Sequence, residues 1–298
     1  MIDSPSLKRD NPLRILIKGF MTIWSVPKAR IGVVLFVIFV GLALFAPLIA
    51  PYSPHDNSFQ RNMSGNLAHL LGTTAAGQDV FSQLIWGARV SVSVGLIAGL
   101  LATIIAVIVG LAWGYLQNFW GESIGFIVNL FLVIPALPLM IVIAAYLQNG
   151  GIGVIVLVVV ITGWAWGARV LRSQTQSVRS RDFVTAARFS GDGFWRIIFR
   201  EILPNMTSLI VASFFGAATA AVLAEAGLEF LGLGNSNTIS WGTMLFWAEN
   251  SNVLLTGQWI QLFAPGLMIA LFAVSMAFIN FGVDGLSNPR LREKGADA

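Results

Sequence analysis

Six long apolar segments set the hydrophobic pattern of this chain, and each is long enough to cross a lipid bilayer. They are rich in Val, Ile, Leu and Phe and almost free of charged residues. About 20 apolar residues suffice for a membrane-spanning helix, and a backbone in lipid must satisfy its own hydrogen bonds, which favours helices. The pattern therefore predicts an all-α membrane protein whose six transmembrane helices lie at about Ile31–Ala50, Val90–Leu116, Ile124–Leu147, Ile152–Val170, Thr207–Gly227 and Ile260–Asn280.

The polar segments beside these spans differ in charge. Lys and Arg are concentrated before the first span, between the fourth and fifth, and after the sixth, whereas the other segments hold few. Because basic residues are retained on the cytoplasmic side of a membrane, both termini and the segment between spans four and five are predicted to be cytoplasmic. The expected divisions are a cytoplasmic N-terminal segment at 1–30, a first span with a long external loop at 31–89, a helical core at 90–285 and a cytoplasmic tail at 286–298.

Composition agrees with a membrane location and removes several classes of function. Of the 298 residues, 56% are hydrophobic and 11% are charged, against about 25% charged in soluble domains. The net charge of +4 is ascribed to the sidedness of the loops, so no nucleic-acid partner is predicted. The absence of Cys excludes disulfides, iron–sulfur clusters and thiolate zinc sites. His55 and His69 both lie in the first external loop, and no metal site is predicted.

The cytoplasmic segment between spans four and five contains a regular spacing of small residues. Two alanines are followed by a glycine and then, about a dozen residues later, by Leu-Pro. Small residues allow a helix to approach another subunit closely, and Gly191 can end such a helix with a positive φ. Arg188 can pair with acidic residues of a partner or with anionic lipid headgroups, although a solvated basic face has the same pattern. The residues concerned are Thr185, Ala186, Ala187, Arg188, Gly191, Leu203 and Pro204.

This spacing resembles the EAA signature of ATP-binding-cassette (ABC) import permeases. The resemblance implies that a short coupling helix lies within residues 182–204 and docks into a cleft of an ATPase subunit. Thr185 stands where the signature has its Glu, whereas the two alanines and the glycine remain.

The external loops narrow the resemblance to the C-type subunit of the oligopeptide/dipeptide/nickel permeases. In the first loop, that pattern is approximately L-G-T-D-x-x-G-R-D-x-x-S-R-x-x-x-G-x-R-x-S, and Thr74, Gln78 and Gln83 depart from it, each removing a charge. The second loop has similar F-L-G-L-G and W-G-x-M elements at 230–234 and 241–244. The matching residues of the first loop are Leu71, Gly72, Thr73, Gly77, Asp79, Ser82, Gly87, Arg89 and Ser91.

The resemblance covers nearly the whole chain and implies partners. It implies a type I ABC importer transmembrane domain in a bacterial inner membrane, paired with a homologous permease subunit, two ATP-binding subunits and an extracytoplasmic solute-binding protein. The chain has no G-x-x-x-x-G-K-[ST] phosphate-binding loop and no catalytic constellation. We therefore expect no enzyme and no cofactor in this chain, and we expect ATP and Mg in the partner ATPases.

Short peptides are the cargo that the resemblance implies. The three lost charges leave neutral oligosaccharides open as an alternative. A stand-alone secondary transporter is a weaker alternative, because it would need intramembrane acids or His for ion coupling, and the middles of the spans have almost none.

Five residues are candidates for the wall of a translocation path. Pro135 and Pro138 should kink span three, either as a packing bend or as a bend that lines the path. Glu225 and Glu229, near the outer end of span five, are costly in lipid and so could contact cargo, although hydration at the interface would also explain them. Trp241 could stack on a sugar or belong to an aromatic belt at the membrane surface.

Overall fold

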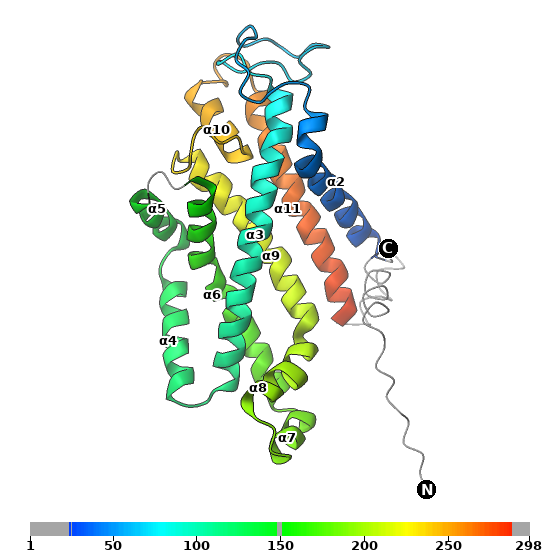
Figure 1. Cartoon of the computed structure of the whole chain (residues 1–298), viewed down its shortest axis with the longest axis vertical. Coiled ribbons are helices and arrows are strands. Elements are labelled where there is room, and N and C mark those ends of the chain that lie inside the picture. Colours follow the sequence, from blue (N-terminus) through cyan, green and yellow to red (C-terminus); the bar gives the residue numbers. More distant parts are fainter. Residues whose placement is uncertain (1–23, 25, 148–150, 288–298) are drawn as a thin grey trace.

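The structure, a computed structural model, describes residues 24, 26–147 and 151–287. Most of the predicted N-terminal segment and of the predicted tail lies outside these residues. Among the described residues, extended pairing is confined to one isolated bridge between Thr73 and Asp79. The helices labelled in Figure 1 are α2 (Pro27–Ile49), α3 (Val80–Tyr115), α4 (Phe119–Val133), α5 (Ala136–Tyr146), α6 (Gly151–Arg179), α7 (Asp182–Phe189), α8 (Phe194–Arg196), α9 (Thr207–Phe230), α10 (Trp241–Asn250) and α11 (Ile260–Ser287).

The predicted spans correspond to the long helices of the bundle. Within the described ranges, five helices are long and apolar enough to cross a membrane, and α4 with α5 makes a sixth if that bent pair is counted as one span. The bend between α4 and α5 is 89°. Pro135 is the N-cap of α5 and Pro138 lies in its first turn, where a missing N–H leaves no intrahelical bond unmade. The predicted kink in span three is confirmed.

α3 and α6 exceed their predicted spans by the most residues. α3 begins at Val80 rather than near residue 90, because Asp79 caps its first turn by accepting from the backbone N–H of Ser82. α6 continues past Val170 to Arg179 through polar residues. The extension of α6 is polar and that of α3 is interrupted by Ser82, Gln83 and Arg89, so the apolar pattern does not include them. At 1.5 Å per residue, the 36 residues of α3 reach about 54 Å, which exceeds the roughly 30 Å hydrocarbon core.

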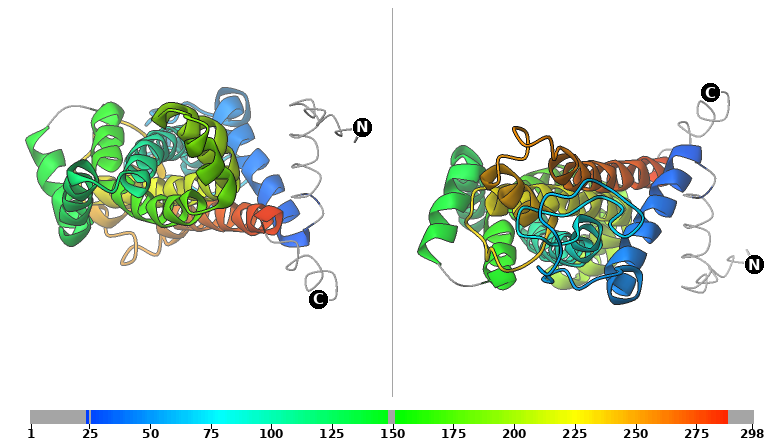
Figure 2. Two further views of the ribbon diagram at one scale, coloured as in Figure 1. Left: turned by 90° about the horizontal axis from the view of Figure 1, so that it is seen from below. Right: turned by 90° about the horizontal axis from the view of Figure 1, so that it is seen from above.

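Small residues let α3 lie directly against α6 and α9. A Cβ on Gly99 would lie 2.7 Å from the Cα of Ala218 in α9, and a Cβ on Gly110 would lie 2.8 Å from the carbonyl oxygen of Ala168 in α6. Such close approach is typical of small residues at membrane helix interfaces. Figure 2 shows α3 inside the bundle, with α4 and α5 at one edge and α2 at the other. α3 is therefore the helix around which the others are arranged.

The two ends of the bundle are built differently (Figure 1). α7 and α8 lie at one end, whereas α10 and the long loop at 50–79 lie at the other. Following the sidedness predicted from the charges, we call the end with α7 the inner end and the end with α10 the outer end.

Candidate functional site at the two ends of the bundle

α7, at the inner end, is a single short helix with a defined stop. Gly191 has φ +84°, its N–H donates to the carbonyl of Arg188, and the N–H of Asp192 donates to the carbonyl of Ala187. These paired bonds form a Schellman motif, in which a glycine takes the left-handed position just past the helix. The prediction that Gly191 ends this helix with a positive φ is confirmed.

The rest of the predicted coupling segment is not a continuation of α7. After the turn at Gly191, the chain forms α8, then a π-helical turn at Ile197–Ile202 and a 3-10 turn at Leu203–Met206 that contains Pro204. The coupling motif is thus divided into a helix and a separate irregular return to α9.

One face of α7 is fixed to the bundle. Val184 is fully buried in the same apolar cluster as Ile197 and Ile202. The guanidinium of Arg188 lies 5.8 Å from the ring centroid of Tyr115 at the end of α3, and the guanidinium of Arg179 lies 5.4 Å from the same ring. Both distances are within the range of a cation–π contact. α7 is therefore attached both to the return segment and to α3.

The opposite face of α7 is uncovered in this chain. Among the motif residues, Ala187 and Leu203 are half-buried, and Thr185, Ala186, Arg188, Gly191 and Pro204 are exposed. Three aromatic side chains on α7, α8 and the π-helical turn are also exposed, to 89%, 69% and 57% for Phe189, Trp195 and Phe199 respectively. A surface this rich in exposed aromatic side chains marks a contact site for a protein or a membrane.

The first outer loop is held together by its own motif residues. Asp79 is fully buried and accepts hydrogen bonds from the Ser82 N–H and hydroxyl, each at 2.7 Å, and its other oxygen lies 2.9 Å from Nδ1 of His69. Gly72 and Gly77 have φ of +80° and +82°, which favours glycine. The hydroxyl of buried Thr73 donates to the carbonyl of Gln60. These residues shape the loop.

Arg89 is the exception among the predicted residues of this motif. Its side chain is exposed on α3, and its guanidinium lies 5.7 Å from the ring centroid of Trp86. Arg89 is therefore accessible on the surface of the single chain.

Glu225 and Glu229 lie one turn apart on α9 and are buried at the outer end. The hydroxyl of Ser91 in α3 donates to Glu225 at 3.2 Å and accepts from the backbone N–H of Trp241. The hydroxyl of Ser240, the N-cap of α10, donates to Glu229. This set of bonds, which we call the outer network, joins α3, α9 and the start of α10.

The outer network leaves part of each carboxyl group unused. Oε2 of Glu225 and Oε1 of Glu229 are buried without a hydrogen-bond partner among the described residues. Neither Glu forms an ion pair within the part of the chain that the structure describes.

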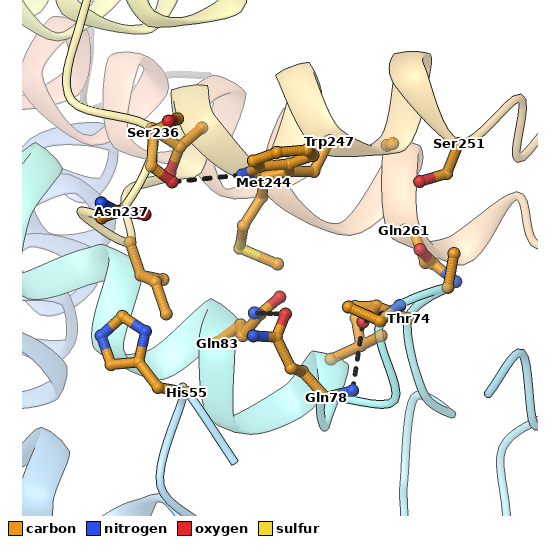
Figure 3. A pocket seen from close by; sticks show the side chains of 16 residues that line it. His55, Thr74, Gln78, Gln83, Ser236, Asn237, Met244, Trp247, Ser251 and Gln261 are labelled. Carbon is orange, nitrogen blue, oxygen red and sulfur yellow. Dashed lines mark hydrogen bonds between the residues drawn. The ribbon is translucent and has the colours of Figure 1, made fainter. Parts of the chain in front are cut away.

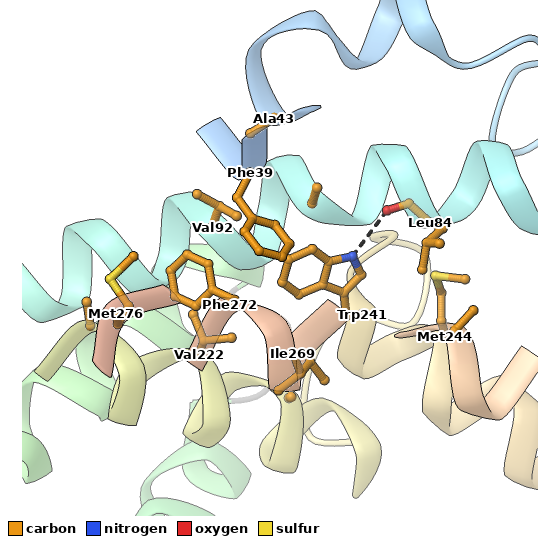
Figure 4. Packing of buried hydrophobic residues seen from close by; sticks show 14 of the residues in the cluster. Phe39, Ala43, Leu84, Val92, Val222, Trp241, Met244, Ile269, Phe272 and Met276 are labelled. Atoms are coloured by element: carbon orange, nitrogen blue, oxygen red, sulfur yellow. Dashed lines mark hydrogen bonds between the residues drawn. The ribbon is translucent and has the colours of Figure 1, made fainter. Parts of the chain in front are cut away.

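Trp241 is buried completely beneath the outer network. Figure 4 shows its indole beside Phe39 of α2 and Phe272 of α11, with ring centroids 5.7 and 6.5 Å away. Its indole N–H donates to the carbonyl of Leu84 at 3.1 Å. Trp241 is 0% exposed, so its ring presents no face to a ligand in this conformation.

The structure brings three of the five predicted path residues together and separates the other two. Glu225, Glu229 and Trp241 meet in the outer network. Pro135 and Pro138 are exposed at the α4–α5 bend, at the edge of the bundle (Figure 1). Their place on a translocation path stays a prediction.

Two cavities were not predicted from the sequence. One, of about 510 Å³, lies between α3, α6 and α9 and is lined mainly by small residues such as Ala102, Gly163, Gly167 and Gly216, together with Asn280. The other, of about 200 Å³, lies at the outer end. For the cavity between α3, α6 and α9, the available sequence signal was the recurrence of small residues at four-residue spacing in spans four and five. The cavity at the outer end is formed by loops that are distant in sequence, so no local pattern indicates it.

Two family models match this chain. Residues 102–293 match the binding-protein-dependent transport system inner membrane component, and residues 27–68 match the N-terminal TM domain of oligopeptide transport permease C. The outer loop, coupling motif and α9–α10 elements described above lie within or between these two matches.

Three known relatives are similar to this chain over most of their length. The di/tripeptide transport system permease protein DppC of Pseudomonas aeruginosa is 31% identical over 297 residues, covering 97% of this chain and 95% of the relative. The dipeptide transport system permease protein DppC of Bacillus subtilis is 30% identical, covering 89% and 82%. The oligopeptide transport system permease protein OppC of Mycobacterium tuberculosis is 31% identical, covering 85% of each chain. The chain, with its long apolar helices, belongs to the binding-protein-dependent transport system inner membrane components, the multi-pass permease subunits of bacterial ABC importers.

Proposed function

We propose that this chain forms half of the membrane path of an ABC importer for short peptides and that α7 couples this path to ATPase subunits. The observation that carries the proposal is the form of α7: its stop is fixed by Gly191, one face is anchored, and the motif face is exposed. The relatives named as di/tripeptide, dipeptide and oligopeptide permeases support peptides as the cargo.

Movement of a docked ATPase would reach the bundle through the anchored face of α7. Val184 packs on the return segment that leads into α9, and Arg188 contacts Tyr115 at the end of α3. α3 runs without a break from Tyr115 to the outer network at Ser91. A helix of this length transmits a displacement as a nearly rigid rod, so a shift at α7 would change the packing at the outer end.

A complete importer needs further subunits that this chain does not provide. A homologous permease subunit would complete the path, and the cavity of about 510 Å³ between α3, α6 and α9 is our candidate for a part of its wall. The predicted path residues of the outer network, with Pro135 and Pro138, would shape its outer half. Two ATP-binding subunits would supply ATP and Mg, and an extracytoplasmic solute-binding protein would deliver the peptide.

The alternative cargo, a neutral oligosaccharide, has no observation in its favour. The relatives cited above are named for peptides, and Trp241, the candidate for stacking on a sugar, is fully buried.

The test is uptake by the complete importer in proteoliposomes. We expect labelled di- and tripeptides to accumulate only when ATP, the ATPase subunits and the binding protein are all present. Accumulation without the ATPases would refute the coupling role. Uptake of cello-oligosaccharides in place of peptides would refute the cargo.

A further inference from the structure

The cavity at the outer end, which we call the outer pocket, has a volume of about 200 Å³ and lies between the first outer loop and α10. Figure 3 shows His55, Gln78 and Gln83 on one side of it, facing Met244 and Trp247 of α10. Among the described residues that line it, none is Asp, Glu, Lys or Arg. The outer pocket is therefore polar and carries no fixed charge.

The three positions that depart from the family pattern by losing a charge all line this pocket. The backbone N–H of Gln78 donates to the hydroxyl of Thr74 at 3.1 Å, and Nε2 of Gln83 donates to Oε1 of Gln78 at 2.8 Å (Figure 3). The three losses of charge are thus neighbouring changes in one site.

The hydrogen bonds fix the orientation of both amides. The carbonyl of Pro54 can only accept, so Nε2 of Gln83, at 3.2 Å, must be the atom that faces it. The second N–H of this nitrogen is used by Gln78. Within the described residues, no hydrogen bond uses Oε1 of Gln83 or Nε2 of Gln78. The two glutamines thus leave one acceptor and one donor unused in the same pocket, which suits the donor and acceptor of an uncharged carboxamide.

We propose that the outer pocket receives an uncharged Asn or Gln side chain of the extracytoplasmic solute-binding protein; this rests on the proposed function. The pocket, at about 200 Å³, is smaller than the roughly 300–1,000 Å³ of small-molecule sites, and an amide side chain fits inside it. A charged side chain would lose its hydration there without gaining a counterion. The pocket thus selects a binding protein by the charge of its docking segment.

Exposed apolar side chains in the segments that follow and precede the pocket residues support a protein as the occupant. Leu67, in the first outer loop, is 99% exposed, and Leu255, just beyond α10, is 87% exposed. Exposed apolar side chains of this kind are typical of a surface that contacts another protein.

The test substitutes one atom of the outer pocket and measures docking. Gln78→Glu keeps the oxygen that accepts from Gln83 and replaces the free NH₂ with a carboxylate oxygen. Gln60→Glu makes the same change at an exposed position of the same loop. The affinity of the peptide-loaded binding protein for the complete importer in nanodiscs is measured for both. We expect Kd to rise at least about tenfold for Gln78→Glu and to stay unchanged for Gln60→Glu.

A second variant separates charge from shape. Ser251→Trp narrows the pocket without adding charge and should also weaken docking. Wild-type docking by both Gln78→Glu and Ser251→Trp would overturn the proposal. Saturable binding of free peptide to the importer without binding protein, abolished by Gln78→Glu, would also overturn it, because the occupant would then be cargo. ATP-dependent peptide uptake by the wild type in the same nanodisc preparation, reconstituted into liposomes, tests the proposed function independently.

Discussion

The inner and outer ends of this bundle both carry motif residues, but they place them in opposite environments. At the outer end, Asp79, Glu229 and Trp241 are buried and bonded to other parts of the same chain. At the inner end, Ala186 and Gly191 are exposed on the surface of the chain. Residues of a family motif can thus stabilise the fold of their own subunit or form a surface for a partner subunit. The burial of each residue distinguishes the two roles.

The two ends should therefore differ in how substitutions affect the stability of the chain and its coupling to the ATPases. Substitutions at the outer end should lower the stability of the chain itself. Substitutions of exposed motif residues on α7, such as Ala186, should leave that stability unchanged and weaken coupling to the ATPases. The predictions below test this distinction from the largest effect to the smallest.

The largest effect is expected for Trp241→Ala at the outer end. The change empties the space beside Phe39 and Phe272 and removes the bond to Leu84. Truncating a buried Trp costs about 3–5 kcal/mol, which should appear as a lower unfolding temperature of the purified chain in detergent. Trp259→Ala is the control, because Trp259 is 56% exposed; equal destabilisation by both would contradict the assignment of Trp241 to the core.

Asp79→Ala should have the next largest effect. It removes the cap of α3 and leaves the Ser82 N–H and His69 without their buried acceptor. Loss of a cap and of a buried partner together cost about 2 kcal/mol, measured as a shift in thermal unfolding. Asp56→Ala, at an acid in the same loop that is bonded to the N–H of Ser58, should cost less than half of this. A stable Asp79→Ala protein would show that the outer loop does not depend on this cap.

Ala186→Glu should affect coupling without affecting stability. Ala186 is exposed on α7, and exposed substitutions are usually within about 0.5 kcal/mol in stability. A loss of about 1.4 kcal/mol of docking free energy would lower ATPase affinity about tenfold, measured by co-purification of the ATPases and by peptide uptake. Gln176→Glu places the same charge at an exposed position of α6, and this control should retain both ATPase co-purification and peptide uptake. Full ATPase binding by Ala186→Glu would contradict a docking role for this face of α7.

The sequence predicted the parts of this molecule that depend on local chemistry. The long apolar spans follow from the cost of exposing polar backbone to lipid, and the stop at Gly191 follows from the conformational freedom of glycine. The kink at Pro135 has the same local origin. These features need only a few neighbouring residues, and the structure confirms them.

The features that the sequence could not predict depend on distant residues. The Ser91–Glu225 bond joins positions 134 residues apart, and the Trp241–Leu84 bond joins positions 157 apart. Trp241 therefore looked like an interfacial or ligand-stacking residue until its neighbours were known. The outer pocket has the same origin, because its two sides come from the first outer loop and from α10.

The smallest effect tests how the inner end is joined to the rest of the bundle. Tyr115→Leu removes the ring on which Arg179 and Arg188 lie, whereas Tyr115→Phe keeps it. Each such contact contributes about 0.5–1 kcal/mol, so α7 would remain folded through Val184 and Gly191 but would be more loosely attached to α3. We expect ATPase binding to be unchanged and the amount of ATP hydrolysed per peptide imported to rise about two- to fivefold in Tyr115→Leu, with Tyr115→Phe close to wild type. If the ratio is unchanged in Tyr115→Leu, movement of α7 reaches the bundle through the return segment and α9 alone.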